Sequence, residues 1–417
     1  MQTTIAPELA DDARAIAAEE VLRKCVHCGF CLATCPTYNL LGDEQDSPRG
    51  RIYLIKQVVE GHKPTASTQV HLDRCLSCRN CETTCPSGVE YGHLIDMGRS
   101  LVEDQVPRPA AQRWLRKGIL AVLPYARRVT PLIKCAQVVR PLMPSVLASS
   151  IPPRQTVPWA PRLVHERKVL VLDGCVQPSM TPATNVSAAR VLSAFGITQI
   201  SVSLSGCCGA VSFHLNDQQA ARVFMRRNID AWWPFVESGC EAIISTASGC
   251  GVMLKDYGHI LADEPEYSEK AMRISELSRD IVEVLVDTLH NEDLSRFNEA
   301  AVGMGKVAYH PPCTLQHGQK LPNVTEQILT RFGFVLTQVA DSHTCCGSAG
   351  TYSIFQPKLS HQLRDNKVKA LLADEPDIIA TSNIGCQLHI QGGSGREVVH
   401  WIELVDKLVT ADSTTVL

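Results

Sequence analysis

The distribution of apolar and polar residues divides the chain into a helical first part and a later part in which strands alternate with helices. Residues 48–61 begin with a proline and end with a glycine. Between these two residues, Ile52, Ile55 and Val59 recur at helical spacing, which predicts a helix. Residues 11–24 have a similar pattern. We therefore expect a mostly α-helical first domain.

After residue 168 the pattern changes, and one succession of features occurs twice. Each copy has an apolar run, a helical stretch and a second apolar run, at 169–172, 218–232 and 242–244 in the first copy and at 307–309, 357–372 and 378–380 in the second. Three landmarks of the two copies lie 138 residues apart. Strands that alternate with helices predict a duplicated α/β domain with mainly parallel sheets.

Eight of the 18 cysteines lie in the first 85 residues, in two copies of C-x2-C-x2-C-x3-C-P. Three thiolates at this spacing can hold three corners of a [4Fe–4S] cluster, and the fourth cysteine lies too far along the loop, so it binds the other cluster. This predicts one cluster on Cys25, Cys28, Cys31 and Cys85, and another on Cys75, Cys78, Cys81 and Cys35. Structural zinc fits poorly, because zinc sites usually pair two C-x2-C units across a longer loop.

The duplicated domain carries a second set of cysteines. Each copy has one early cysteine, a Cys-Cys-Gly sequence and one late cysteine, and the early and late ones follow predicted strands, where open α/β sheets place their sites. One hypothesis is an additional cluster or metal site in each copy, held by Cys175, Cys207, Cys208 and Cys250, and by Cys313, Cys345, Cys346 and Cys386. The alternative is that some of these are buried free cysteines that pack as small apolar residues.

Other polar residues near the cysteines are weaker candidates. We expect four of them to make hydrogen bonds or packing contacts rather than bind metal: His27, His310, His343 and Asp341. Asn228 and Asn366 follow the two Cys-Cys-Gly sequences at the same distance, and either hydrogen-bond a sulfur or dock their helix. Cys135 and Cys240 fit neither pattern and are predicted to be structural.

Composition and charge restrict the class of protein. The chain has 417 residues, of which 45% are hydrophobic and 20% charged, and these values exclude wholesale disorder. A net charge of −3 argues against a nucleic-acid binder with a basic surface. The sequence has no secretory signal and no apolar run long enough to span a membrane, which predicts a cytoplasmic chain. In that compartment clustered cysteines usually bind metal.

The charge is unevenly distributed. Residues 107–168 contain 12 Lys or Arg residues, one acidic residue and 10 of the 24 prolines. Within this segment we expect short basic helices over 113–140 and an extended linker over 141–162. The segment is predicted to dock on anionic lipid headgroups or on an acidic partner, or to be a solvated linker.

The predicted domains are 1–105 with the two clusters, the basic linker 106–166, and the two copies 167–300 and 301–417.

The sequence has no glycine-rich dinucleotide motif and no P-loop. Because Fe–S clusters pass single electrons, we expect a flavin-containing partner to perform the two-electron substrate chemistry. The doubled cysteine motif followed by two Cys-Cys-Gly domains resembles the heterodisulfide-reductase-like Fe–S oxidoreductases. Longer segments are similar to the iron–sulfur subunits of bacterial glycolate oxidase (glycolate dehydrogenase), namely 25–57, 71–89, 228–234, 246–251, 341–353, 363–367 and 383–387.

The resemblance implies a multi-subunit complex. Two FAD-linked-oxidase-type subunits would oxidise glycolate to glyoxylate, with D-lactate as a further substrate, and this chain would contribute no catalytic residue. It would carry electrons through two [4Fe–4S] clusters to a quinone-type acceptor, from the cytoplasmic side of the inner membrane. The relatives end each Cys-Cys-Gly domain in C-x-x-C, but Cys250 and Cys386 lack that last cysteine, which argues against a five-thiolate cluster. The alternatives are a subunit of a glycerol-3-phosphate or lactate dehydrogenase, or a metal- or redox-responsive binding module.

Overall fold

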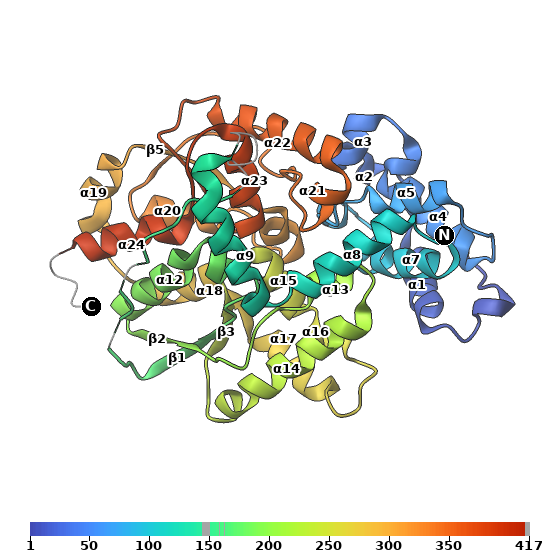
Figure 1. Cartoon of the computed structure of the whole chain (residues 1–417), viewed down its shortest axis with the longest axis horizontal. Coiled ribbons are helices and arrows are strands. Elements are labelled where there is room, and N and C mark those ends of the chain that lie inside the picture. The colour runs from blue at the N-terminus through green and yellow to red at the C-terminus, as the bar shows by residue number, and fades with distance from the viewer. Residues whose placement is uncertain (144–150, 158, 162, 413–417) are drawn as a thin grey trace.

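The computed structural model describes residues 1–143, 151–157, 159–161 and 163–412. A helical N-terminal module lies at one end of the molecule, and two sheets with their helices form the rest (Figure 1). Among the described residues, no helix has the length and apolar character needed to cross a membrane. The predicted linker over 141–162 lies partly outside the described residues.

The N-terminal module confirms the predicted helical domain. Its helices are η1 (Pro7–Leu9), α1 (Ala13–Lys24), α2 (Phe30–Ala33), α3 (Pro36–Leu41), η2 (Glu44–Asp46), α4 (Pro48–Val59), α5 (Ala66–Asp73), α6 (Asn80–Thr83) and α7 (Tyr91–Gln105). Helix α4 begins where predicted, because Pro48 occupies its first turn and the Ser47 side chain accepts a hydrogen bond from the Gly50 amide. Its buried face includes Ile52 and Ile55, and it packs against α1 and α7.

The basic segment is helical where amphipathic helices were predicted. It forms α8 (Ala110–Val122), α9 (Ala126–Val139) and the short η3 (Arg140–Leu142). Helix α9 packs on α11 (Gln177–Met180) of the first repeat. Residues 151–157 and 159–161 have neither helix nor strand, in agreement with an extended linker. The segment therefore lies against the body of the protein (Figure 1).

The first repeat contains a parallel four-stranded sheet. Its elements are β1 (Arg167–Val171), α11, α12 (Pro182–Ala194), β2 (Ile197–Ser201), α13 (Ala210–His214), α14 (Gln218–Glu237), β3 (Ala242–Ser245), α15 (Ser248–Lys255), α16 (Tyr257–Ile260), α17 (Ser268–Leu277), β4 (Ser278–Asp280), α18 (Ile281–Thr288), η4 (Ser295–Phe297) and α19 (Asn298–Gly303). The strand order is β2-β1-β3-β4, and all pairs are parallel.

The second repeat has the same topology. Its elements are β5 (Lys306–His310), η5 (Thr314–Gly318), α20 (Val324–Arg331), β6 (Val335–Leu336), α21 (Tyr352–Phe355), α22 (Pro357–Leu372), β7 (Ile378–Thr381), α23 (Ile384–Ser394), β8 (Val398–His400) and α24 (Trp401–Ala411). The order β6-β5-β7-β8 matches the first sheet strand for strand, with parallel pairing throughout. The predicted fold class, a helical domain followed by a duplicated α/β unit, is confirmed.

One apolar core joins the two repeats. Alternate residues of a strand face opposite sides of its sheet. Val169 and Val171 of β1 share a core with Val307 and Tyr309 of β5, through helices α12, α18, α20 and α24. Helices α12 and α24 also pair through buried polar contacts, including the Ser187 hydroxyl on the Asp406 carboxylate at 2.8 Å. The opposite face of each sheet packs on α14 or α22, and the cysteines lie on that side.

Candidate metal centres

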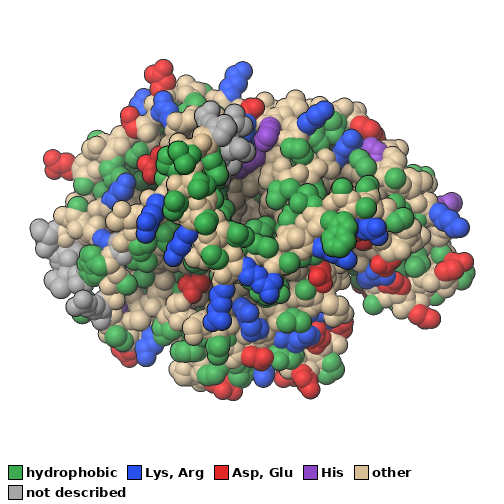
Figure 2. Space-filling view, viewed as in Figure 1, with side chains coloured by type: hydrophobic (Ala, Val, Ile, Leu, Met, Phe, Trp, Pro, Cys, Tyr) green, Lys and Arg blue, Asp and Glu red, His purple; other side chains and the backbone are tan. Residues whose placement is uncertain are grey.

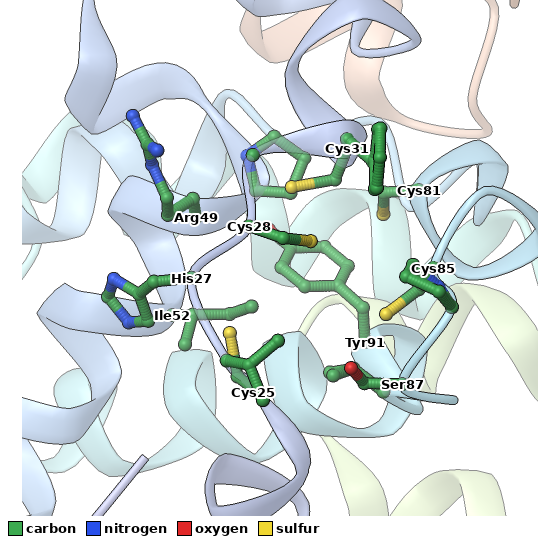
Figure 3. A pocket seen from close by; sticks show the side chains of 16 residues that line it. Cys25, His27, Cys28, Cys31, Arg49, Ile52, Cys81, Cys85, Ser87 and Tyr91 are labelled. Carbon is green, nitrogen blue, oxygen red and sulfur yellow. The ribbon is translucent and has the colours of Figure 1, made fainter.

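The eight N-terminal cysteines line two neighbouring hollows. The first is lined by Cys25, Cys28, Cys31 and Cys85, and also by Cys81. Figure 3 shows these sulfur atoms around a common space, while the His27 ring lies to one side. The second hollow is lined by Cys35, Cys75, Cys78 and Cys81. The structure therefore brings together both sets of four cysteines that the spacing predicted.

Left-handed backbone positions curl each motif around its hollow. In the first motif His27 has φ 58° and Gly29 has φ 87°; in the second, Ser77 has φ 50° and Arg79 has φ 58°. The short helices α2 and α6 begin directly after Gly29 and Arg79 and pack against each other. A proline follows the fourth cysteine of each motif, and Pro36 starts α3. The fourth cysteine is thereby directed to the other motif's hollow.

The spacing of the sulfur atoms distinguishes a cluster from a single ion. A zinc ion holds thiolates at about 2.3 Å, so the sulfur atoms around it lie within about 4.6 Å of one another. Within the described residues, no group of three ligand atoms that close together involves the N-terminal cysteines. These cysteines therefore lack the close spacing of a preformed single-zinc shell. Burial raises the pKa of Cys78 and Cys81 well above the ordinary value, so metal binding must displace their protons.

A buried charge network supports the second hollow. The Asp46 carboxylate is completely buried and faces three cationic or titratable groups: Arg74 at 2.8 Å, His71 at 3.1 Å and Arg51 at 3.4 Å. Arg51, itself a lining residue, also donates to the His71 carbonyl at 2.7 Å. Sequence reasoning missed this network, because its members contact one another only once α4 and α5 pack together.

In each repeat the four predicted cysteines also converge. The thiols form a continuous series of side-chain contacts from Cys175 through Cys207 and Cys208 to Cys250. The second repeat repeats this series with Cys313, Cys345, Cys346 and Cys386. In both, the first cysteine follows a strand and the last lies in the helix after β3 or β7. The structure therefore brings together the four predicted cysteines of each repeat.

The two asparagines proved not to be equivalent. Asn228 is fully buried and docks α14: its amide donates to the Cys207 carbonyl at 2.9 Å and its oxygen accepts from Gly206 at 2.9 Å. The expected counterpart Asn366 is exposed, so its predicted role at a site is wrong. Helix α22 is shifted by one residue, and the buried Lys367 takes this place. Its ammonium donates to the Asp341 carbonyl at 2.6 Å.

The second repeat lies directly against the second hollow. Cys78 packs in one apolar cluster with Cys313, Cys345 and Leu76. His317, which sequence reasoning did not single out, joins the two modules: its ring contacts the Thr83 hydroxyl at 2.9 Å and the His343 carbonyl at 3.0 Å. In this contact His343 contributes its backbone carbonyl, which also accepts a hydrogen bond from the Asn80 amide at 3.3 Å. No comparable contact links the described first-repeat cysteines to Cys78.

Comparison with known proteins agrees with both modules. Residues 21–89 match the 4Fe-4S dicluster domain, and residues 169–255 and 307–391 match the cysteine-rich CCG domain. The glycolate oxidase iron-sulfur subunit of Escherichia coli (strain K12) is 52% identical over 98% of this chain and 99% of its own length. The chain belongs to the glycolate oxidase iron–sulfur subunit family. The resemblance found in the sequence is therefore confirmed.

More distant members and neighbours of the family give the same picture. The probable glycolate oxidase iron-sulfur subunit of Bacillus subtilis (strain 168) is 30% identical, over 94% of each chain. Lactate utilization protein A of Bacillus licheniformis is 28% identical, but over 48% of this chain and 82% of its own. The family assignment makes the chain an oxidoreductase component with Fe–S domains.

Proposed function

We propose that the chain is the electron-transfer subunit of a multi-subunit glycolate dehydrogenase. FAD-containing partner subunits would oxidise glycolate to glyoxylate, and this chain would pass the electrons to a membrane acceptor such as quinone. The observation that carries the proposal is the pair of adjacent four-cysteine hollows, with Cys81 lining both, in a chain of this family. When bound, two [4Fe–4S] clusters would supply one-electron carriers.

The eight N-terminal cysteines are proposed as the ligands, with Cys85 and Cys35 crossing between the motifs. The first hollow reaches the surface at Cys28, which is exposed. Two large apolar side chains beside it are also exposed, Val26 by 68% and Phe30 by 64%. An exposed apolar rim of this kind suits a protein contact. We therefore place the flavoprotein partner here, so that electrons enter at the first hollow and leave through the second.

Glycolate is the preferred substrate in this proposal because glycolate oxidase subunits match nearly the whole chain. The lactate utilization proteins match about half of it. D-lactate is proposed as a second substrate of the complex. The domains 1–105, 106–166, 167–300 and 301–417 are proposed as the boundaries of the functional units.

Glycolate added anaerobically to the purified complex is expected to bleach the cluster absorption of this chain. The partners supply the electrons, so the same addition to the chain without its partners should leave the absorption unchanged. The measurement is a visible and EPR spectrum before and after glycolate, with glycerol 3-phosphate and L-lactate as comparison substrates. Full bleaching by glycerol 3-phosphate and none by glycolate would assign the chain to a different dehydrogenase.

Peripheral membrane attachment is proposed for the surface formed by α8, α9 and η3. Three of its apolar side chains are strongly exposed: Trp114 by 72%, Val138 by 75% and Leu142 by 88%. Exposed cations surround them, among them Arg113, Lys117, Arg127, Arg128 and Lys134. Figure 2 shows Lys and Arg interspersed with apolar side chains on this face. Aromatic and aliphatic residues among cations match an anionic lipid surface.

The chain is expected to float with vesicles containing phosphatidylglycerol at low salt, and to float less at high salt. Each cation near the surface contributes about 1 kcal/mol, which salt screens. The double change Lys117→Glu with Lys134→Glu should lower the bound fraction, whereas Lys270→Glu on α17 should not. Equal flotation with neutral vesicles, or binding only to the flavoprotein partner, would overturn the lipid assignment.

A further inference from the structure

The second repeat contains a compact group of three ligand atoms, contributed by His310, Cys346 and Cys386. All three residues are buried, and their ligand atoms lie within 4.8 Å of one another. They come from the end of β5, from the Cys-Cys-Gly loop and from α23. Zinc binds sulfur at about 2.3 Å and imidazole nitrogen at about 2.0–2.1 Å, so the donors around one ion are separated by up to about 4.6 Å. The group has the dimensions of a single-ion coordination shell.

The His310 imidazole is unusual among the buried polar side chains near the thiols, because both of its ring nitrogens lack a hydrogen-bond partner among the described residues. It is completely buried. A neutral imidazole carries one donor and one acceptor, and burying either without a partner costs free energy. His317, by contrast, uses both ring nitrogens in hydrogen bonds. An imidazole that is unpartnered beside two thiols has the surroundings of a metal ligand.

The strand register explains why the first repeat lacks this group. Ala308 of β5 packs in one apolar cluster with Cys346 and Cys386, and His310, two residues later, faces the same side. Val169 pairs with the first residue of β3, and Val307 pairs with the first residue of β7, so these two valines occupy equivalent positions. Leu172 and His310 each lie three residues further along and are therefore also equivalent. Leu172 packs in the same cluster as Cys208 and offers no ligand atom.

Charge also distinguishes the two repeats. Lys367 is buried beside the second series of thiols, and its charge interacts with Cys345 and Cys346. The neutral Asn228 takes the corresponding place in the first repeat.

We propose that His310, Cys346 and Cys386 bind one divalent ion of the zinc class, and that only the second repeat has this mixed imidazole–thiolate centre. Cys345, whose thiol contacts that of Cys346, is proposed as the fourth donor of a tetrahedral shell. The ion would join β5, the Cys-Cys-Gly loop and α23 into one unit. Because Cys78 packs against this unit, the ion would also fix the surface that supports the second hollow. The proposal does not depend on the proposed electron transfer.

The test uses the full chain, isolated anaerobically with its iron, incubated with Zn²⁺ and then freed of unbound metal. The wild type is expected to retain about one zinc ion, with both nitrogen and sulfur in the zinc X-ray absorption shell. His310→Leu, which copies the first repeat, should weaken zinc retention by at least the roughly 10- to 100-fold that loss of an outer-shell partner costs. His361→Leu makes the same change on the exposed face of α22 and should retain zinc like the wild type.

His310→Cys keeps a metal ligand at this position, so it tests the site even if the leucine variant does not fold. It should retain zinc with an all-sulfur shell. An all-sulfur shell in the wild type, or equal zinc retention by wild type and His310→Leu, would overturn the proposal. So would a wild type that retains no zinc. The iron content of each sample is measured in parallel, since the iron of the N-terminal module tests the proposed function and is expected to stay unchanged in all variants.

Discussion

Replacing Cys85 with serine is expected to halve the iron content of the anaerobically purified chain, from about eight to about four atoms. Cys85 comes from the second motif but lines the first hollow with Cys25, Cys28 and Cys31. Its loss should therefore empty that hollow and leave the second one, whose ligands are untouched. Glycolate-driven reduction of the remaining cluster should fall to a small fraction of the wild-type rate, because the entry site is missing. Iron analysis and EPR on the isolated variant check this result.

Two further variants distinguish the loss of one particular cluster from a general loss of iron. Cys35→Ser should remove the other cluster instead, so the two variants must have different EPR spectra at the same iron content. Cys135→Ser should change nothing, since Cys135 is exposed on α9 and fits neither motif. Identical spectra for the Cys85 and Cys35 variants would contradict the crossed ligand assignment.

Replacing Asp46 with alanine is expected to destabilise the N-terminal module by about 3–5 kcal/mol, the cost of removing one partner from a buried ion pair. The change leaves the Arg51 guanidinium, 1% exposed, without the carboxylate that faces it. It also removes the carboxylate that Arg74 and His71 contact. Urea unfolding under anaerobic conditions, followed by cluster absorption and circular dichroism, should show a lower midpoint and faster iron release.

An exposed ion pair of the same module serves as the comparison. Glu90 and Lys24 approach to 2.5 Å with side chains 55% and 44% exposed, so Glu90→Gln should cost at most about 1 kcal/mol. If the Asp46 variant unfolds at the same urea concentration as the Glu90 variant, the buried network does not stabilise the module.

Short runs of apolar residues made the central strands predictable, and the spacing of the cysteines made the cluster motifs predictable. The apolar runs at β1, β3, β5 and β7 are buried on both faces and stand out in the sequence. The edge strands were missed: β6 has two residues, and β4 consists of Ser278, Arg279 and Asp280. Their pairing depends on the neighbouring strand rather than on their own pattern.

The one misassigned site residue, Asn366, has a similar origin. Sequence reasoning matched Asn228 to Asn366 by the 138-residue offset of the first three cysteines in each copy, but α22 is shifted by one residue from that offset. Asn366 was therefore chosen and Lys367 overlooked. His310 was expected to make hydrogen bonds or packing contacts, and its complete burial agrees with packing. Within the described residues neither ring nitrogen has a hydrogen-bond partner, and the ring lies beside Cys346 and Cys386. Only the strand register showed which side of the sheet it faces.

The most direct test of the central claim is a Mössbauer spectrum of the ⁵⁷Fe-enriched chain, isolated anaerobically with its native metal. We predict that nearly all the iron, about eight atoms per chain, has the spectrum of [4Fe–4S] clusters, in two populations of equal area. The Cys85→Ser variant should lose one population only. Iron present as isolated thiolate-bound ions, or four atoms or fewer in the wild type, would contradict the two-cluster account.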